Sequence, residues 1–390
     1  MAKKTLSAKE KFRAKLRGTL DGVEMSSSKY AEVSEWIDTG DYGLNRICSG
    51  DIYKGIPCGR VVVFSGESQS GKSLISCDVA ANALNKNKFD VVYFFDGEGG
   101  AMKKMFQSRG CDLDLIEHIL VDSVEDALIK IVTAFKEILE FQKSGEEYKA
   151  LFILDSLGAL ITNKVISDVE KEKVAGDMGL RAKTCNLLVK ACTIPALRSN
   201  VPFIIVNHIY ANPNATYEEK IKQMSGGMGI SYQSRLVIQC AQNYGIDDKD
   251  KKKGRERYYN YNTLTFFTTK NSFAKPTYQT VMVLNLNKGP VKLMGIFDTA
   301  IKYGFIQQNG GYYKIPSCDT PDKSFRKAEI LTNEKLWESF MDDLNAKSYD
   351  ELSYGGKEIL DDDLEFLEQQ LIDPTVDGIG DDIDIDSLTE

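Results

Sequence analysis

Short apolar runs recur along the chain, and most are followed by a segment with helical periodicity. The runs have the length of single strands and lie at residues 61–64, 91–95, 151–154, 203–206, 236–238, 263–267 and 281–284. Continuous apolar runs of this length are typical of strands that are buried on both faces. The clearest helical periodicity lies at 123–139 and at about 178–197. Because strands that alternate with helices form parallel sheets, the pattern predicts an α/β fold with helices on both faces of a parallel-rich sheet.

The two ends of the chain differ from this alternating middle. Residues 6–20 predict an amphipathic helix, with a capping box between Ser7 and Glu10. Its apolar residues recur every four positions from Phe12 to Leu20, and its other face is basic. The expected divisions are a basic N-terminal helix with a linker (1–35), an α/β core (36–289), a small C-terminal α/β domain (290–355) and an acidic tail (356–390).

The charge of the chain is very uneven. The net charge of −8 over 390 residues, taken alone, argues against a nucleic-acid partner. Residues 356–390, however, hold 13 acidic residues and one lysine, so this tail carries −12 and the other 355 residues carry +4. The tail has too few large apolar residues for a core of its own and is expected to be disordered. The protein is thus a mildly basic body with an acidic tail.

Composition excludes several classes of protein. No run approaches 18 apolar residues, which excludes a membrane span, and the N-terminus has no apolar signal region. The eight cysteines form no C-x-x-C pair and are expected to be reduced and mostly buried, as in a cytoplasmic protein. With only two histidines, His118 and His208, the chain has little material for a histidine-based triad or metal cluster.

A phosphate-binding loop is the most specific motif in the chain. It follows the strand at 61–64 and precedes a helical segment at 74–84, which is the context that the motif requires. Its backbone amides and the helix N-terminus would bind phosphates, Lys72 would reach the β and γ phosphates, and Ser73 would ligate Mg²⁺. The predicted ligands are therefore ATP and Mg²⁺. The motif residues are Gly66, Glu67, Ser68, Gln69, Ser70, Gly71, Lys72 and Ser73.

Two acidic residues follow buried strands and are candidates for the chemistry. Asp155 ends the run at 151–154 and has the form of the second magnesium ligand of such sites. Glu98 follows the run at 91–95 by two residues and could orient and polarise an attacking water. For Glu98 a solvated loop acid is an equally good interpretation of the sequence.

Two long segments, 164–177 and 210–229, are expected to be loops that follow buried strands. Loops of this length inside a compact domain are usually functional or disordered. The helix between them carries Arg181, Lys183, Lys190 and Arg198, which suits either nucleic-acid binding or an ordinary solvated basic face.

These residues, with further motifs in the same order, resemble the RecA recombinase family. The resemblance begins with the glycine-rich stretch 39–60 and covers about residues 36–315. His208 after Asn207, together with the acidic tail, is most similar to the UvsX recombinases of large, T4-like phages. The further matches are Asp96-Gly97-Glu98, Leu154-Asp155-Ser156, Asp177-Met178-Gly179-Leu180, Val206-Asn207-His208, Ser225-Gly226-Gly227, Thr269-Lys270-Asn271 and the stretch 295–313.

The resemblance implies a RecA-like ATPase core and a DNA-dependent ATPase that polymerises on single-stranded DNA and exchanges it with a homologous duplex. Glu98 falls at the catalytic glutamate of the family, and Asn207 with His208 falls at a γ-phosphate sensor. Lys270 falls where a lysine reaches the γ-phosphate of a neighbouring protomer, and the N-terminal helix would pack on the adjacent subunit. The two long segments fall on the DNA-binding loops, and the implied DNA contacts are Met178, Lys183, Lys190, Gly226 and Gly227.

The chain also departs from the family pattern. A second interface lysine is replaced by Ser272, and Lys275 could substitute for it. The residue that stacks on adenine in the family is usually Tyr, whereas here the position holds Met105, next to Phe106. The second loop lacks an obvious Phe, although Tyr210 or Tyr217 could wedge bases apart.

Two other functions share these motifs. A hexameric helicase has the same ATPase core but usually a larger N-terminal domain, and a non-catalytic recombinase paralogue would bind nucleotide and act as a mediator. The expected partners of the recombinase itself are single-stranded and duplex DNA, further copies of the chain, a single-strand-binding protein and a mediator or loader, with no membrane.

Overall fold

The computed structural model describes residues 7–173, 179–210, 223–242 and 261–354. These lie in a compact unit, Met1–Tyr354, that is built around a 10-stranded sheet with the order β12-β11-β10-β9-β3-β7-β6-β4-β5, and β8 pairs with β7 beside it. Six neighbouring strands, from β9 to β5, run parallel, and β10, β11 and β12 extend the sheet as antiparallel strands. The strands are β3 (Val61–Gly66), β4 (Val91–Asp96), β5 (Ile116–Leu120), β6 (Ala150–Asp155), β7 (Phe203–Tyr210), β8 (Gln223–Met224), β9 (Leu236–Gln242), β10 (Tyr261–Asn271), β11 (Gln279–Asn285) and β12 (Gly289–Pro290).

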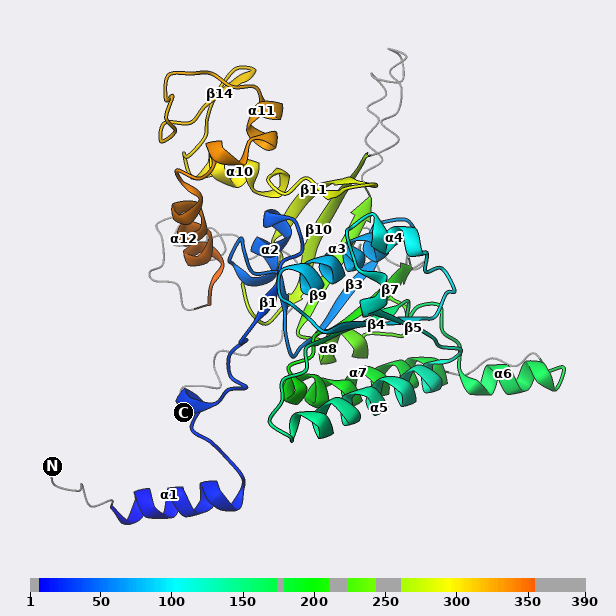
Figure 1. The fold of residues 1–390 in the computed structure, drawn as a ribbon. Coiled ribbons are helices and arrows are strands. Elements are labelled where there is room, and N and C mark those ends of the chain that lie inside the picture. Colours follow the sequence, from blue (N-terminus) through cyan, green and yellow to red (C-terminus); the bar gives the residue numbers. More distant parts are fainter. Residues whose placement is uncertain (1–6, 174–178, 211–222, 243–260, 355–390) are drawn as a thin grey trace, which may run out of the picture. The chain divides into compact units, whose positions relative to one another are not determined.

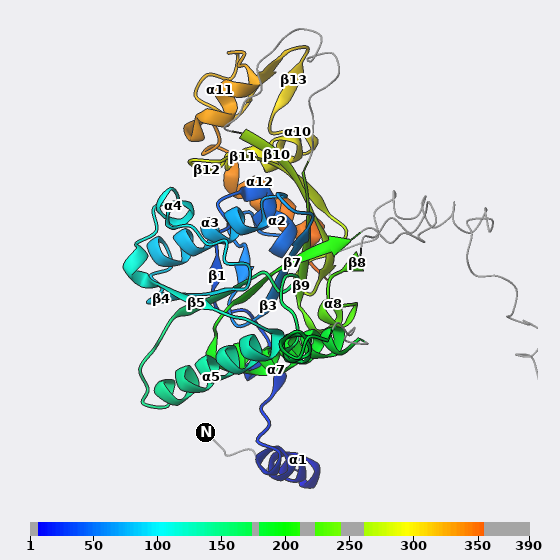
Figure 2. The ribbon, with the colours of Figure 1, turned by 90° about the vertical axis from the view of Figure 1, so that its right-hand side faces the viewer.

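Helices cover both faces of this sheet, as Figures 1 and 2 show. On one face lie α2 (Tyr42–Ser49), α3 (Lys72–Asn85) and the short α4 (Lys103–Gln107), and on the other lie α5 (Val124–Gln142), α7 (Leu180–Ser199) and α8 (Gly229–Gln233). Side chains alternate between two cores, as the pleat requires: Val62 and Phe64 face α2 and α3, whereas Val61 and Val63 face α5 and α7. The predicted α/β fold with a parallel-rich sheet is confirmed.

A third, smaller core lies in the C-terminal part of the unit. It contains Ile296, Phe297, Trp337 and Phe340 and includes Ile52 from the N-terminal half. The elements of this part are α10 (Met294–Lys302), the hairpin of β13 (Gln307–Asn309) and β14 (Tyr312–Lys314), α11 (Lys327–Thr332) and α12 (Met341–Leu352). The predicted domain boundaries remain predictions, and the acidic tail lies outside the described residues.

The N-terminal helix forms as its capping box predicted. It is α1 (Ala8–Thr19), in which Ser7 accepts from the backbone of Glu10 and the Glu10 side chain accepts in return. None of its residues is buried, and Phe12 and Leu20 are 67% and 69% exposed. A small ladder of β1 (Trp36–Ile37) and β2 (Ile56–Pro57) follows it. Among the described helices, none has both the length and the apolar character needed to cross a bilayer.

Two features of the fold were not predicted. The edge strand β5 was missed because it is only partly covered, so that none of its residues is buried and polar Glu117 and His118 interrupt its apolar residues. The segment 164–177 was expected to be a loop, but residues Asn163–Glu170 form helix α6, which Thr162 caps by accepting from the amide of Val165. An ion pair between Lys164 and Asp168, 3.7 Å apart, adds to this helix.

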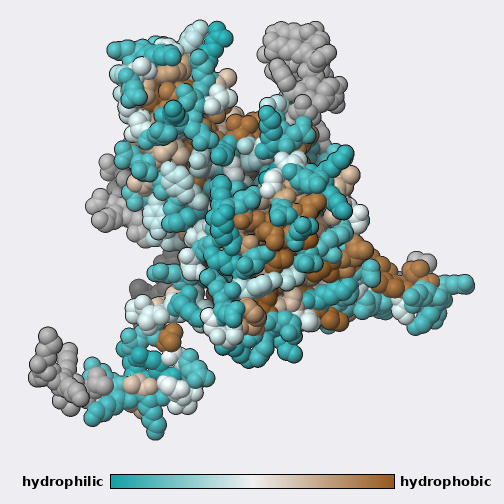
Figure 3. All heavy atoms as spheres, viewed as in Figure 1, coloured by the Kyte–Doolittle hydropathy of each residue, from teal (hydrophilic) through white to brown (hydrophobic). Residues whose placement is uncertain are grey.

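Apolar surface gathers near the β5 edge of the sheet. Leu120 of β5 and Val169 of α6 are 59% and 63% exposed, and Ile161 between β6 and α6 is 42% exposed. Figure 3 shows apolar surface on the viewed face from the centre of the molecule toward α6.

Candidate active site

The carboxyl ends of the parallel strands meet at one edge of the sheet and hold most of the predicted site. Gly66 at the end of β3 is paired with His208 of β7, and Asp155 at the end of β6 is paired with Asp96 of β4. These pairings bring the phosphate-binding loop, the candidate metal ligand and the Glu98 loop to the same edge. This is where ligands bind in open α/β sheets.

The loop after β3 requires glycine at both ends. Gly71 is the N-cap of α3 with φ +84°, and a Cβ there would lie 2.6 Å from Leu264 Cδ1. A Cβ on Gly66 would lie 2.5 Å from the carbonyl oxygen of Cys240. Because no side chain caps α3, its first amides are available to an anion in the loop.

Lys72 lies inside this loop. Its side chain donates to the carbonyl oxygens of Gly66 at 3.0 Å and Glu67 at 2.5 Å, and it is 3.3 Å from the Ser70 hydroxyl. Burial lowers the pKa of Lys72, although the carboxylates of Asp155 and Glu98 act in the opposite direction. The ammonium group is therefore placed where phosphate oxygens would bind.

Ser73 and Asp155 provide hard oxygen ligands side by side. Asp155 is 8% exposed and shares a hydrogen bond with Ser73. Burial raises the pKa of Asp155 to about 6, and the hydrogen bond to Ser73 opposes this shift. A buried carboxylate beside a hydroxyl fits a divalent cation that takes its other ligands from phosphates and water, as Mg²⁺ does. Among the described residues, no group of three or more His, Cys, Asp or Glu side chains could hold a metal ion. The cation would therefore need the additional ligands.

Asp96 fixes the loop that carries Glu98. Its carboxylate accepts from the backbone amides of Glu98 at 3.0 Å, Gly99 at 2.7 Å and Ala101 at 3.1 Å. Burial opposes ionisation of Asp96, but the amide of Ala101, the side chain of His118 and the other two amides together lower its pKa. The ionised Asp96 thus determines where the Glu98 backbone lies.

The two histidines of the chain both contact this acidic segment. His118 Nε2 lies 3.1 Å from an Asp96 oxygen, and His208 Nε2 lies 2.8 Å from Glu98 Oε1. The hydroxyl of Ser156 donates to the same Glu98 oxygen. Burial opposes the charged form of Glu98, but the hydrogen bonds from Ser156 and His208 and the charge of Lys72 together lower its pKa. Glu98 is therefore held ionised, as a residue that orients water requires.

Five of the predicted site residues line one hollow of about 70 Å³. Ser73, Asp155 and Glu98 line it together with Met105 and Phe106 of α4. Phe106 is also part of the core, since it is 5% exposed and packs edge-on against Phe94. Met105 is partly buried and is the more accessible of the two for contact with a base.

The sensor position links this site to the base of the second loop. Asn207 is fully buried, and its side-chain amide donates to the carbonyl oxygen of Ser225 at 2.8 Å. Its carbonyl oxygen accepts from the amide of His208 at 2.9 Å. His208, which contacts Glu98, therefore directly follows Asn207, which holds Ser225.

Comparison with known proteins gives one consistent result. The chain is 26% identical to the "Recombination and repair protein" of Enterobacteria phage T4 over 316 residues, which is 81% of this chain and 75% of that protein. It is 24% identical to the "Protein RecA" of Wolbachia sp. subsp. Brugia malayi over 286 residues, 72% of each chain, and 25% identical to that of Methylobacterium radiotolerans over 293 residues, 75% of this chain and 73% of that one. No family model matches the chain.

Over most of its length the chain is similar to recombinases of the RecA family. The family binds DNA and uses a nucleotide with a divalent metal, and the fold described above agrees with it.

Lys270 lies away from the candidate nucleotide site of its own chain. It is paired with Val237 near the start of β9, whereas the phosphate-binding loop lies beside Cys240 farther along the same strand. Its side chain donates to the carbonyl oxygens of Ser231 at 3.0 Å and Tyr232 at 2.7 Å, at the end of α8. Burial lowers the pKa of Lys270, and the charge of Arg235 lowers it further. A role at a neighbouring protomer stays a prediction.

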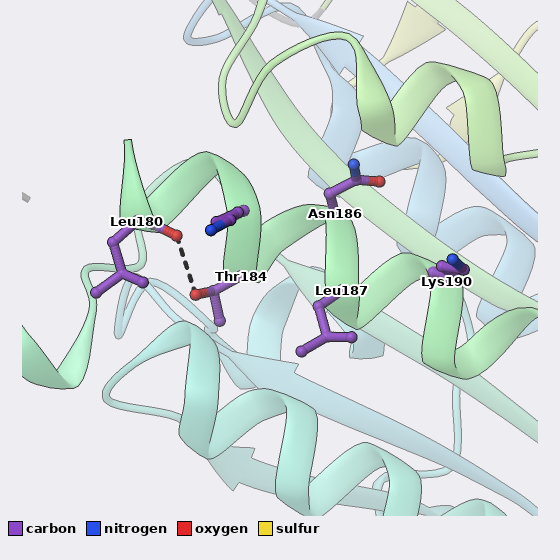
Figure 4. Close-up of a pocket in the computed structure, with 6 residues that line it drawn as sticks. Leu180, Thr184, Asn186, Leu187 and Lys190 are labelled. Atoms are coloured by element: carbon purple, nitrogen blue, oxygen red, sulfur yellow. Dashed lines mark hydrogen bonds between the residues drawn. The ribbon is translucent and has the colours of Figure 1, made fainter. Parts of the chain in front are cut away.

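The predicted DNA contacts that the structure describes lie on α7 and in the turn before α8. Lys183 and Lys190 are exposed on α7 and line a groove of about 380 Å³ with Leu180 and Leu187. Figure 4 shows that its lining residues all come from α7, and the Thr184 hydroxyl donates to the Leu180 carbonyl oxygen at 3.0 Å. Met178 lies outside the described residues.

Gly226 and Gly227 both have φ +84°, which only glycine adopts without strain. A Cβ on Gly226 would lie 2.8 Å from Ile230 Cδ1, whereas the nearest atom to one on Gly227 is Ala182 Cβ at 3.8 Å. Gly226 thus fixes the turn, whereas a Cβ on Gly227 would make only an ordinary contact with Ala182.

Sequence reasoning missed several residues of the site. Ser156 could have been found, because it directly follows Asp155 in a motif that was noted. Asp96 was noted only as part of the acidic segment, and its three amide contacts are visible only in the folded loop. His118 carried no signal.

Proposed function

We propose that this chain is an ATP-dependent homologous recombinase that forms helical filaments on single-stranded DNA and pairs the bound strand with a homologous duplex. As a DNA-dependent ATPase of recombination and repair it would use ATP and Mg²⁺. The observation that carries the proposal is the contact between His208 and Glu98. This contact joins the residue that would orient water to a strand that leads into the second predicted DNA loop.

In this proposal each residue has a separate task in hydrolysis. Lys72 and the first amides of α3 bind the phosphates, and Ser73 with Asp155 holds the metal. Bound Mg²⁺ would neutralise charge on the phosphate oxygens. Glu98 accepts a hydrogen bond from the attacking water, and Ser156 and His208 keep its carboxylate in place.

The filament is proposed to complete the site. Lys270, with Lys275 as a possible second cation, would reach the γ-phosphate bound to a neighbouring protomer, while α1 packs on the adjacent subunit. The exposed Phe12 of α1 and Leu20 at its C-cap support such a contact, because an apolar stripe that the described residues leave exposed suits a partner. The contacts to the DNA backbone would leave base edges free for pairing. They would come from Met178, Lys183, Lys190, Gly226 and Gly227. A single-strand-binding protein and a mediator are the further partners we propose.

Three measurements test the function. ATP turnover should rise strongly with single-stranded DNA, electron micrographs should show filaments on that DNA, and the chain should exchange strands between homologous DNAs. Lys72→Ala should abolish turnover in all conditions. Rings in place of filaments would identify a hexameric helicase. Nucleotide binding without hydrolysis or strand exchange would identify a non-catalytic mediator.

A further inference from the structure

Arg181 does not belong to the exposed basic face of α7. It lies in the first turn of the helix, after the N-cap Gly179, and is partly buried, whereas Lys183 and Lys190 are exposed. Its guanidinium donates to the carbonyl oxygens of Leu160 at 2.6 Å, Gly158 at 2.7 Å and Leu157 at 3.1 Å. A fourth hydrogen bond, of 2.9 Å, goes to the hydroxyl of Ser225. One side chain thus bridges the turn 157–160 and the base of the second predicted DNA loop.

The turn 157–160 borders the catalytic carboxylate. It begins directly after Ser156, which donates to Glu98. The amide of Leu157 donates to the carbonyl oxygen of Val206 at 3.0 Å, just before the sensor pair of β7. Gly158 lies against the ring of His208, since a Cβ there would be 2.6 Å from His208 Cδ2. Movement of this turn would therefore shift both groups that hold Glu98.

Ser225 closes the same network from the other side. Its amide donates to the carbonyl oxygen of His208 at 2.8 Å, and its own carbonyl oxygen accepts from the side chain of Asn207 at 2.8 Å. Gly226 and Gly227 follow it directly. The hydrogen bonds form a ring that runs from Ser225 through Arg181 to the turn 157–160, then to Glu98, and back through His208.

We propose that Arg181 is the positioning residue through which the second DNA loop controls the placement of Glu98. A loop displaced by bound DNA moves Ser225. The rigid guanidinium of Arg181 transmits this movement to three carbonyl oxygens of the turn 157–160. This turn directly follows Ser156, which donates to Glu98. Arg is suited to this task because its planar fork donates in several fixed directions, whereas Lys donates from a single point. The inference rests on the proposed function, because it requires turnover that responds to DNA.

The test compares Arg181→Lys with Arg198→Lys. Arg198 is exposed in the last turn of the same helix and provides a matched control for the substitution. Turnover of ATP is measured with and without an unstructured oligodeoxythymidine, and affinity for this DNA is measured separately. Since Ser156 and His208 still hold Glu98, we expect R181K to keep DNA-independent turnover within about twofold and DNA affinity within about threefold, while stimulation by DNA falls at least about tenfold. R198K should match the parent in all three.

A second variant makes the interpretation independent of folding effects. Ser225→Ala removes the hydroxyl at the other end of the bridge, so it should also lower stimulation, and the double variant should be no worse than R181K alone. Multiplicative losses in the double variant would overturn the proposal, as would full stimulation in R181K. A loss of stimulation that only follows a loss of DNA affinity would make Arg181 a DNA ligand and would also overturn it. A parent whose turnover ignores DNA would instead refute the proposed function.

Discussion

At the scale of single residues, the site depends on hydrogen bonds that place Glu98. The carboxylate is contacted by Ser156 after β6 and by His208 in β7, while Asp96 fixes its backbone. The pKa of Glu98 is lowered because these contacts outweigh the cost of burial. A preorganised and ionised carboxylate needs little rearrangement when water and nucleotide bind.

Glu98→Gln should therefore slow hydrolysis and retain ATP. The amide keeps the shape of the side chain but cannot act as a base, so we expect turnover to fall about 100-fold or more with ATP affinity nearly unchanged. Single-turnover hydrolysis and nucleotide binding measure the two quantities. Glu117→Gln, an exposed residue of β5, is the control. Unaltered turnover in E98Q would remove Glu98 from the mechanism.

His118→Ala tests the support behind Asp96. Loss of the contact to Asp96 frees the Glu98 loop, and a small misplacement of a catalytic group costs rate, so turnover should fall about fivefold while the affinity for ATP changes little. His118→Gln, which can still donate to Asp96, should recover most of the rate. If alanine and glutamine variants have the same turnover, the hydrogen bond has no positioning role.

At the scale of elements, the start of α2 contains a buried acid at its N-cap. Asp41 is fully buried, and one carboxylate oxygen accepts from the amide of Leu44 at 2.8 Å. Its other oxygen has no hydrogen-bond partner among the described residues. Burial raises the pKa of Asp41 to about 8, although the amides of Leu44 and Gly43 oppose the shift. Asp41 thus caps the helix, but burial keeps its carboxyl group protonated in the folded chain.

This cap predicts a pH dependence of stability. Between about pH 4 and pH 8 the unfolded chain releases the Asp41 proton and the folded chain retains it, so this group makes the folded state less stable as pH rises. Asp41→Asn keeps the cap acceptor and removes the titration. The free energy of unfolding of D41N minus that of the parent should increase by up to about 1 kcal/mol for each pH unit in that interval. Urea unfolding at pH 5, 6, 7 and 8 measures this, and parallel curves for the two proteins would contradict it.

At the scale of the whole molecule, charge is divided between a body of +4 and a tail of −12. The basic residues of α1 and the exposed Lys183 and Lys190 of α7 belong to the body. We expect a tail of this charge to compete with DNA phosphates, and we expect salt to weaken this competition by screening the charges.

Removal of residues 356–390 should therefore tighten binding to duplex DNA. We expect about tenfold tighter binding at 50 mM salt and little difference at 300 mM salt, because the effect is electrostatic. Fluorescence anisotropy with a duplex of fixed length measures both affinities. A tail of the same length with its acids changed to amides separates charge from bulk. Equal affinities at 50 mM salt would leave the tail a role in solubility or docking.

The sequence alone determined the features that depend on neighbouring residues. The phosphate-binding loop, the buried strands, the capping box at Ser7 and the division of charge are all set by residues close together in the chain, so their patterns predict them. The positions of Glu98 and Asp155 at strand ends were predictable for the same reason, since parallel strands end at one edge of the sheet.

Only the tertiary structure decided which side chains meet. His118 contacts Asp96 because β5 pairs with β4 in one particular register, and no local pattern encodes that register for a half-exposed edge strand. Arg181 and Lys183 have the same charge and lie two residues apart, yet one faces the turn 157–160 and the other faces solvent. Helical geometry and the packing of α7 on the sheet separate them, because residues two apart point in different directions around a helix.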